Sequence, residues 1–331
     1  MDPIAKLDSL PRLRLCRLPT PLDPMRRLSE RLGLTDGPEL WIKRDDLTGL
    51  AFGGNKGRKL EFCLAEARRL GADVVFTSGG NQSNHCRQTA IAAVALGFEA
   101  HLFLSGDRPP RMTGNLLPAE ISGAELHFAD DDPRATRQER IDRVAEQLKA
   151  RGRRVYVIPG GASSPTGTMG YVEAVREIAS QQDEIGGAFD WIVCATGSGG
   201  TQVGLLVGRA IVGMEARIQA FAVRPLEDVD RRRADLASAC VKSAALVGAD
   251  VTVGIDDVLL DDAYGGTGYD VPTDAGRAAI ELLARTEGVF LDNCYTAKAM
   301  AGLLDYVRTG RFAPGQRVLF LHTGGNIALF A

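Results

Sequence analysis

Short apolar runs alternate with longer amphipathic stretches along most of the chain. The short runs predict buried strands at 40–43, 73–76, 100–104, 155–158, 191–195, 218–223 and 318–321. The longer stretches carry apolar or alanine residues at helical spacing and predict helices at 58–70, 84–96, 132–150, 202–212 and 273–286. Alternation of this kind indicates an α/β fold with parallel sheets covered by helices, in which ligands bind at the carboxyl ends of the strands.

The order of these elements also predicts two lobes. A chain of 331 residues is long for one core and suits two domains of roughly 100–200 residues. We expect residues 55–166 to form a small domain, inserted into a larger one made from residues 1–54 and 167–331. No internal repeat or low-complexity linker interrupts this arrangement.

Composition narrows the classes of function. Hydrophobic residues make up 45% of the chain and charged residues 24%, with a net charge of −3, which gives no attraction to nucleic acid or to an anionic membrane. No apolar run approaches the ~20 residues of a membrane span, and the N-terminus lacks a signal-peptide core. The six cysteines show no paired spacing, so neither a metal cluster nor a disulfide framework is expected. We expect a cytoplasmic protein without a metal ion.

One lysine lies in an unusual setting, the turn Gly53-Gly54-Asn55-Lys56 between a predicted strand and a predicted helix. Glycines accept positive φ and let a flat ligand approach the backbone, which a lysine placed for solubility does not need. Lys56 is therefore the candidate reactive amine. A surface lysine after a tight turn is the alternative that this segment alone leaves open.

A second glycine-rich turn separates the predicted strand 191–195 from the predicted helix 202–212. It consists of Thr196, Gly197, Ser198, Gly199, Gly200 and Thr201. Converging backbone N–H groups at a helix start, together with two hydroxyls, are typical of a cradle for a small phosphate ester. The loop lacks the lysine of a Walker A motif and the frame of a dinucleotide fingerprint. An ordinary glycine-rich turn is the alternative.

The last polar turn, His322-Thr323-Gly324-Gly325, follows the final predicted strand. The Thr323 hydroxyl could lie against the edge of a planar heterocycle, whereas we interpret His322 as a structural histidine because the other histidines show no ligand spacing. Ser83 has no nucleophile elbow around it, which argues against hydrolase chemistry. An amine, a phosphate cradle and a hydroxyl-bearing turn are together what pyridoxal 5'-phosphate needs.

With these segments in view, the sequence resembles the pyridoxal 5'-phosphate enzymes that comprise D-cysteine desulfhydrase, 1-aminocyclopropane-1-carboxylate deaminase and L-cysteate sulfo-lyase. The resemblance covers nearly the whole chain. Its matching motifs are Pro19-Thr20-Pro21-Leu22, Ile42-Lys43-Arg44-Asp45-Asp46, Gly53 to Lys56 with Arg58-Lys59-Leu60-Glu61, Gln82-Ser83-Asn84-His85 with Arg87-Gln88-Thr89, Ile158-Pro159-Gly160, the loop Thr196 to Thr201, Tyr269 before a Val-Pro pair, Asp292 with Tyr295-Thr296-Ala297-Lys298, and His322-Thr323-Gly324-Gly325.

The resemblance implies fold type II of these enzymes, similar to the tryptophan synthase β architecture, with two open and mostly parallel sheets flanked by helices. It implies that Lys56 carries the cofactor covalently, that Asn84 meets its phenolic oxygen, that the loop Thr196 to Thr201 holds its phosphate and that Thr323 meets its ring. Substrate binding is implied for Ser83, Asn84, His85 and Thr296, and catalytic roles for Lys56, Ser83, Tyr269 and Tyr295. A homodimer acting on a small amino acid is also implied.

The resemblance further divides the family. Deaminases carry a glutamate after the second tyrosine and a leucine before the final glycine pair, whereas this chain has Thr296 and Thr323, as the desulfhydrases do. We therefore expect α,β-elimination, with D-cysteine converted to pyruvate, hydrogen sulfide and ammonia. The alternatives are an L-cysteate sulfo-lyase, a cyclopropane deaminase and a non-catalytic protein that binds an amino acid. The pairs Asn293-Cys294 and Asn326-Ile327 depart from the family pattern beside supposed pocket residues.

Overall fold

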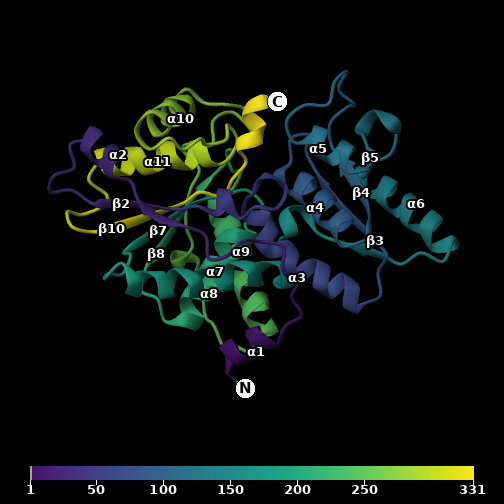
Figure 1. Ribbon diagram of the computed structural model, residues 1–331, viewed down its shortest axis with the longest axis horizontal. Helices are drawn as coiled ribbons and strands as arrows, with labels where there is room; N and C mark the ends of the chain where they lie inside the picture. The colour runs from purple at the N-terminus through teal and green to yellow at the C-terminus, as the bar shows by residue number, and fades with distance from the viewer. Residues whose placement is uncertain (1) are drawn as a thin grey trace.

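Two separate sheets form the frame of the molecule in the computed structural model, which describes residues 2–331 (Figure 1). The larger sheet has the strand order β1-β2-β10-β7-β8-β9, and only β1 runs antiparallel to its neighbour. The smaller sheet has the order β5-β4-β3-β6 and is wholly parallel. In chain order the strands are β1 Leu22–Pro24, β2 Glu39–Lys43, β3 Val74–Gly79, β4 Glu99–Leu104, β5 Glu125–His127, β6 Val155–Val157, β7 Trp191–Thr196, β8 Arg217–Ala222, β9 Leu259–Asp261 and β10 Arg317–Leu321.

Helices cover both faces of the larger sheet, as Figure 1 shows. Successive side chains of a strand point to opposite faces. In β10, Leu319 and Leu321 pack in one core with helices α7 to α9, whereas Val318 and Phe320 pack in another with α10 and α11. The helices are α1 Pro3–Ser9, α2 Arg26–Arg31, α3 Asn55–Arg69, α4 Asn84–Ala95, α5 Leu116–Ile121, α6 Arg137–Ala150, α7 Pro165–Glu184, α8 Gly200–Val212, α9 Val229–Leu246, α10 Asp274–Glu287 and α11 Thr296–Arg308.

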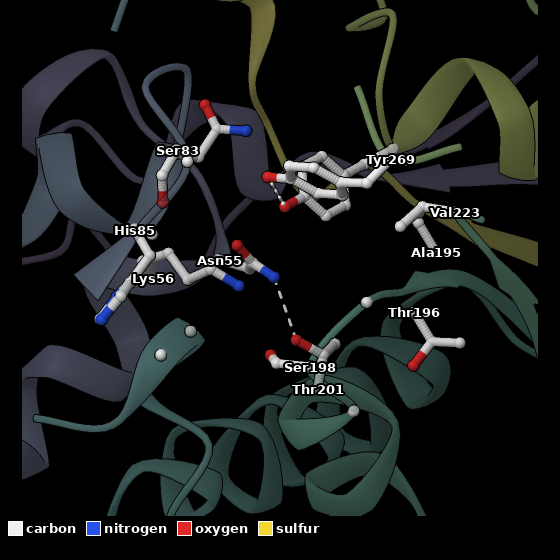
Figure 2. Close-up of a pocket in the computed structure, with 18 of the residues that line it drawn as sticks. Asn55, Lys56, Ser83, His85, Ala195, Thr196, Ser198, Thr201, Val223 and Tyr269 are labelled. Carbon is white, nitrogen blue, oxygen red and sulfur yellow. Dashed lines mark hydrogen bonds between the residues drawn. The ribbon is translucent and has the colours of Figure 1, made fainter. Parts of the chain in front are cut away.

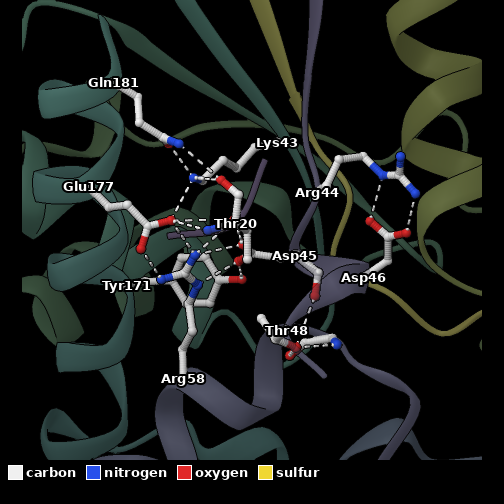
Figure 3. A network of polar contacts seen from close by, with 11 residues as sticks. Thr20, Lys43, Arg44, Asp45, Asp46, Thr48, Arg58, Tyr171, Glu177 and Gln181 are labelled. Carbon is white, nitrogen blue, oxygen red and sulfur yellow. Dashed lines mark hydrogen bonds and ion pairs between the residues drawn. The ribbon is translucent and has the colours of Figure 1, made fainter. Parts of the chain in front are cut away.

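A buried charge network fixes the start of α3 against the larger sheet (Figure 3). Arg58 of α3 donates to both carboxylate oxygens of Asp45, at 2.8 and 2.9 Å, and to both of Glu177, each at 2.9 Å. Lys43, at the end of β2, donates to Glu177 at 2.6 Å, and Tyr171 of α7 donates to Asp45 at 2.6 Å. The two positive charges of the network thus balance its two carboxylates. Because Arg58 follows Lys56 by two residues, the network holds the helix turn that carries Lys56.

The predicted α/β class with two mostly parallel sheets is confirmed. Every predicted strand and helix is present, with shifts of a few residues at the ends. The helix expected from 132 begins only at Arg137, because Thr136 caps it in a reciprocal box with Glu139. The sequence interpretation gave no bounds for α1, α2, α5, α7, α9 and α11 or for the three-residue strands β1, β5 and β9. The boundaries of the two domains remain a prediction. No helix in residues 2–331 is long and apolar enough to cross a membrane.

Candidate active site

A cavity of about 420 Å³ gathers the segments that the sequence singled out. Its wall includes the starts of α3 and α4, the loop after β7 and the end of β8, with two tyrosines and Thr323. Strands β2, β10 and β7 are parallel neighbours, so their carboxyl ends open at one edge of the sheet. The backbone N–H of Asn55 donates to the Thr323 carbonyl at 3.0 Å, which joins the two outer segments at that edge.

Lys56 lies in the second position of α3. The two glycines before it adopt backbone conformations that residues with a side chain rarely adopt. Gly53 and Gly54 have φ of 72° and 121°, and a Cβ on Gly53 would lie 1.8 Å from the Asp46 carbonyl oxygen. The turn therefore brings the lysine into the cavity wall with no carboxylate beside it (Figure 2). Burial lowers the pKa of Lys56 to about 8. A neutral, nucleophilic amine is thus accessible near physiological pH.

The loop Thr196 to Thr201 lies across the cavity from Lys56, as Figure 2 shows for its labelled members. Gly199 has φ of 93°, and α8 begins at Gly200. The first N–H groups of a helix have no intrahelical acceptor and carry partial positive charge. The Asn55 side chain donates to the Thr201 hydroxyl at 3.0 Å and so ties the loop to the lysine turn. This geometry suits a phosphate group.

A second buried lysine lies behind the same loop, and the sequence interpretation missed its position. The Lys59 Nζ atom donates to the Gly161 carbonyl at 3.3 Å and lies 5.9 Å from the centre of the Tyr171 ring. A Cβ on Gly200 would be 3.0 Å from that Nζ atom. Burial, and after it the charge of Lys56, hold the pKa of Lys59 well below its ordinary value. An anion at the loop would compensate this cation.

The start of α4 offers open backbone donors to a substrate carboxylate. Ser83 caps the helix by accepting the Cys86 N–H at 3.2 Å, and its hydroxyl proton remains available to the cavity. The His85 ring is occupied, since Nε2 lies 2.7 Å from the Thr77 hydroxyl and Nδ1 3.3 Å from that of Thr89. Any contact of His85 with substrate would therefore come from its backbone N–H rather than from its ring.

Tyr269 and Tyr295 form a hydrogen-bonded pair at the cavity. Their hydroxyl oxygens are 2.7 Å apart and their rings meet edge to face with centroids 5.8 Å apart. Burial raises the pKa of both phenols, so both stay protonated at neutral pH. One hydroxyl proton lies in the hydrogen bond between the two tyrosines, and the other is free to be donated to a leaving group.

Thr323, expected to meet the cofactor ring, and Thr296, expected to bind substrate, differ in their positions. Thr323 lines the cavity. Thr296 does not line it, because its buried hydroxyl donates to Asp292 at 2.6 Å and accepts the Asp292 N–H at 2.8 Å. The substrate contact expected of Thr296 is therefore not supported by the geometry. His322 is structural as expected, with Nε2 donating to the Phe290 carbonyl at 2.9 Å and Nδ1 accepting the Gly324 N–H at 3.2 Å.

The two departures from the family pattern lie outside the cavity wall. Cys294 is buried and its N–H donates to Asp292 at 2.9 Å. Ile327 faces an apolar surface groove instead, on the side of α5. Neither pair lines the active-site cavity. The sequence interpretation overlooked Asn55, Gly161, Arg137 and Arg224 as lining residues. Only Asn55 carried a local signal, because it stands inside the glycine-lysine turn.

The residues present fit pyridoxal phosphate. The Oδ1 atom of Asn84 and the hydroxyl of Thr196 are buried without a hydrogen-bond partner in the described chain, as expected of a site shaped for a polar ligand. Lys56 supplies the amine, and Lys59 with the start of α8 supplies the positive charge that a phosphate needs. Asn84 and Thr323 would border the ring. The bound group would supply an electron sink for carbanion chemistry.

Comparison with known proteins agrees with this fit. A model of the pyridoxal-phosphate dependent enzyme family matches residues 13–324, and the chain belongs to that family. Among its relatives, the D-cysteine desulfhydrase of Salmonella newport (strain SL254) is 41% identical over 338 residues, which span 99% of this chain and 98% of the relative. The D-cysteine desulfhydrase of Salmonella choleraesuis (strain SC-B67) is 42% identical over 339 residues with the same coverage.

Solved structures place the chain in the same fold. A crystal structure of a homologue of ACC deaminase superposes with a TM-score of 0.88 at 39% identity, over 99% of this chain and 96% of that one. A crystal structure of a threonine deaminase superposes with a TM-score of 0.66 at 18% identity, over 98% of this chain and 97% of that one, which supports the fold alone. Fold type II is thereby confirmed, and so is the dependence on pyridoxal phosphate.

Proposed function

We propose that this protein converts D-cysteine and water to pyruvate, hydrogen sulfide and ammonia by α,β-elimination. The observation that carries the proposal is the meeting, in one cavity, of Lys56, the open start of α4 and the hydrogen-bonded pair Tyr269 and Tyr295. Full-length similarity to the desulfhydrases supports the choice of substrate.

Each residue group then has one task. The N–H groups at the start of α4 and the Ser83 hydroxyl hold the substrate carboxylate, because a helix start favours an anion. Lys56, with its pKa of about 8, is basic enough to take the α-proton and is neutral in a useful fraction near pH 7. The departing sulfur needs a proton, and the protonated hydroxyls of the tyrosine pair at the cavity can donate it.

A second reaction, loss of sulfite from L-cysteate, is favoured by the charge of the cavity wall. Arg137, at the start of α6, and Arg224, after β8, both line the cavity, and the lining contains no Asp or Glu. Neither arginine forms an ion pair within residues 2–331. An added sulfonate on the β-carbon would therefore meet positive charge and no like charge.

Ammonia and 2-oxo acid release, measured side by side, tests both reactions: pyruvate is the expected oxo acid from D-cysteine, L-cysteine and L-cysteate, and 2-oxobutanoate from 1-aminocyclopropane-1-carboxylate. Sulfide from D-cysteine well above the other substrates would support the desulfhydrase. Sulfite from L-cysteate as the main product, lost in the Arg137→Gln and Arg224→Gln variants but retained in Arg151→Gln, would establish the sulfo-lyase instead. Cofactor binding without turnover of any of the four would favour an amino-acid-binding protein.

We also propose, from the resemblance of the sequence to its family, a homodimer that works in the cytoplasm on a small amino acid, without nucleic acid. Light scattering of the cofactor-loaded protein tests the assembly. A mass of twice 35.4 kDa is expected, and a mass of 35.4 kDa would contradict the dimer.

A further inference from the structure

The first turn of α11 carries a buried lysine that the proposed chemistry does not use. Lys298 is fully buried, and its Nζ atom donates three hydrogen bonds to backbone carbonyls: Val223 at 2.8 Å, Gly265 at 2.8 Å and Gly268 at 3.0 Å. An ammonium group has three donors, so this set is complete. Among residues 2–331 no carboxylate lies within ion-pair distance of it; burial lowers the pKa of Lys298, and the more distant Asp270 and Asp292 only partly oppose this, so the three carbonyls carry most of its stabilisation.

The three acceptors belong to two segments that border the cavity. Val223 directly follows β8 and lines the cavity itself. Gly265 and Gly268 lie in the loop that leads directly into Tyr269. The loop lies close against the backbone after β8: a Cβ on Gly265 would be only 2.5 Å from the Arg224 carbonyl carbon. Without such a clamp the loop would be weakly held, since Tyr269 is 38% exposed and no strand or helix contains it.

The same helix turn also holds the second tyrosine. Asp292, just before α11, accepts the Tyr295 N–H at 2.8 Å and the Thr296 N–H at 2.8 Å. One short stretch of chain therefore fixes the backbone of Tyr295 through Asp292 and the approach of Tyr269 through Lys298. Asp270, which follows Tyr269, has φ of 63°, a conformation that persists only where the surroundings impose it.

We infer that Lys298 is a positioning residue that clamps the 265–268 loop so that the Tyr269 hydroxyl reaches that of Tyr295. The inference rests on the catalytic role proposed for the tyrosine pair, but it makes a separate statement about where Tyr269 lies. Lys298→Met keeps most of the apolar stem and removes all three donors. Lys43→Met is the matched control, because Lys43 is an equally buried lysine whose partners, Thr20, Glu177 and Gln181, lie away from the cavity.

The first experiment is a double-mutant cycle on the cofactor-loaded enzyme with Tyr269→Phe. Lys298→Met should lower kcat at least tenfold, and the double variant should match Tyr269→Phe within about twofold, because the hydroxyl that Lys298 positions is already absent. Lys43→Met should reduce thermal stability, and any loss of kcat that it causes should multiply with that of Tyr269→Phe. Independent, multiplying losses for Lys298→Met, or an unchanged kcat, would overturn the inference. If Lys298→Met does not fold, Lys298→Gln, which keeps two donors, enters the same cycle.

A second measurement does not depend on turnover. In protein labelled with 3-fluorotyrosine, Tyr269→Phe assigns one of the six tyrosine signals in the 19F NMR spectrum. That signal should shift or broaden in Lys298→Met and stay unchanged in Lys43→Met. An unmoved Tyr269 signal in Lys298→Met refutes the clamp. Normal kcat in Tyr269→Phe, by contrast, would refute the catalytic role of the tyrosine and leave the clamp to be decided by the spectrum.

Discussion

Lys56 and Lys59 lie three residues apart on α3, the first half-buried in the cavity wall and the second fully buried, and the charge of Lys56 is the second cause, after burial, that lowers the pKa of Lys59. Two neighbouring amines on one helix face, of which the buried one has a single carbonyl contact, are stable only with an anion nearby or with one of them neutral. The cavity provides for both: Lys56 faces the space where an aldehyde would bond, and Lys59 lies behind the start of α8.

Replacing Lys56 and replacing Lys59 should therefore have different effects on the cofactor. Lys56→Ala should abolish the borohydride-stable cofactor adduct, because no other amine is proposed to bond the aldehyde. Lys59→Met should retain the adduct on Lys56 but weaken cofactor retention by about 1–3 kcal/mol, the cost of a lost charge-assisted contact. Peptide mass mapping after reduction gives the site, and dialysis against a cofactor trap gives the retention. An adduct mapped to any lysine but Lys56 would contradict the assignment.

The lowered pKa of Lys56 predicts a pH profile for the cofactor-free protein. With a pKa of about 8 rather than the usual 10.5, the neutral amine should rise about tenfold per pH unit below pH 8 and level off above it. Labelling with an amine-reactive reagent across pH 6–10, read by mass spectrometry, measures this. Exposed Lys149 is the internal control and should continue to gain reactivity up to pH 10. Parallel profiles for the two lysines would rule out the shift.

The charge network behind Lys56 should make the free energy of unfolding fall at acidic pH. Arg58 and Lys43 lower the pKa of Glu177 to about 2 from its usual 4.5, against the opposing effect of burial. A depressed carboxyl pKa stabilises the fold above pH 4.5, and the contribution is lost as the pH falls from 4.5 to 2. The shift corresponds to about 3 kcal/mol.

Glu177→Gln should therefore reduce the free energy of unfolding by about 3–5 kcal/mol at pH 7, since it leaves an uncompensated buried charge. The difference from the unmodified protein should shrink towards pH 2.5. Glu281→Gln removes the carboxylate of the exposed pair with Arg285 and should cost less than about 0.5 kcal/mol at either pH. Thermal unfolding at both pH values measures the effect, and equal losses for the two variants would exclude the network as a stabilising unit.

The sequence predicted features that depend on neighbouring residues and missed those that depend on packing between distant segments. Strand β7 and the lysine turn were predictable, because apolar runs and paired glycines are local signals. Lys59 and Lys298 were only motif members, since their burial arises where α3 packs against α7 and where α11 meets the loop before Tyr269. The orientation of Thr296 has a local cause that the sequence pattern also did not show. Its hydroxyl partner, Asp292, is four residues away, but only the cap geometry at the start of α11 turns the side chain from the cavity.

The choice between elimination and ring opening rests on Thr323. Its side chain lines the cavity, and the resemblance assigns a hydroxyl at this position to enzymes that expel sulfur rather than open a cyclopropane ring. The unmodified protein should thus open 1-aminocyclopropane-1-carboxylate at a negligible rate beside its cysteine turnover. Thr323→Leu should lower cysteine turnover at least tenfold while the adduct on Lys56 persists, because a polar partner is replaced by an apolar group of similar reach.

Thr323→Ser is the control for that variant, since it keeps the hydroxyl and should keep most of the turnover. The paired change Thr296→Glu is not a clean companion, because the new carboxylate would meet that of Asp292, which now accepts the Thr296 hydroxyl at 2.6 Å. Loss of folding in Thr296→Glu, with Thr323→Leu well folded, is therefore expected from melting curves. Ring opening by the unmodified protein at a rate near that of cysteine would show that a threonine at 323 does not select elimination.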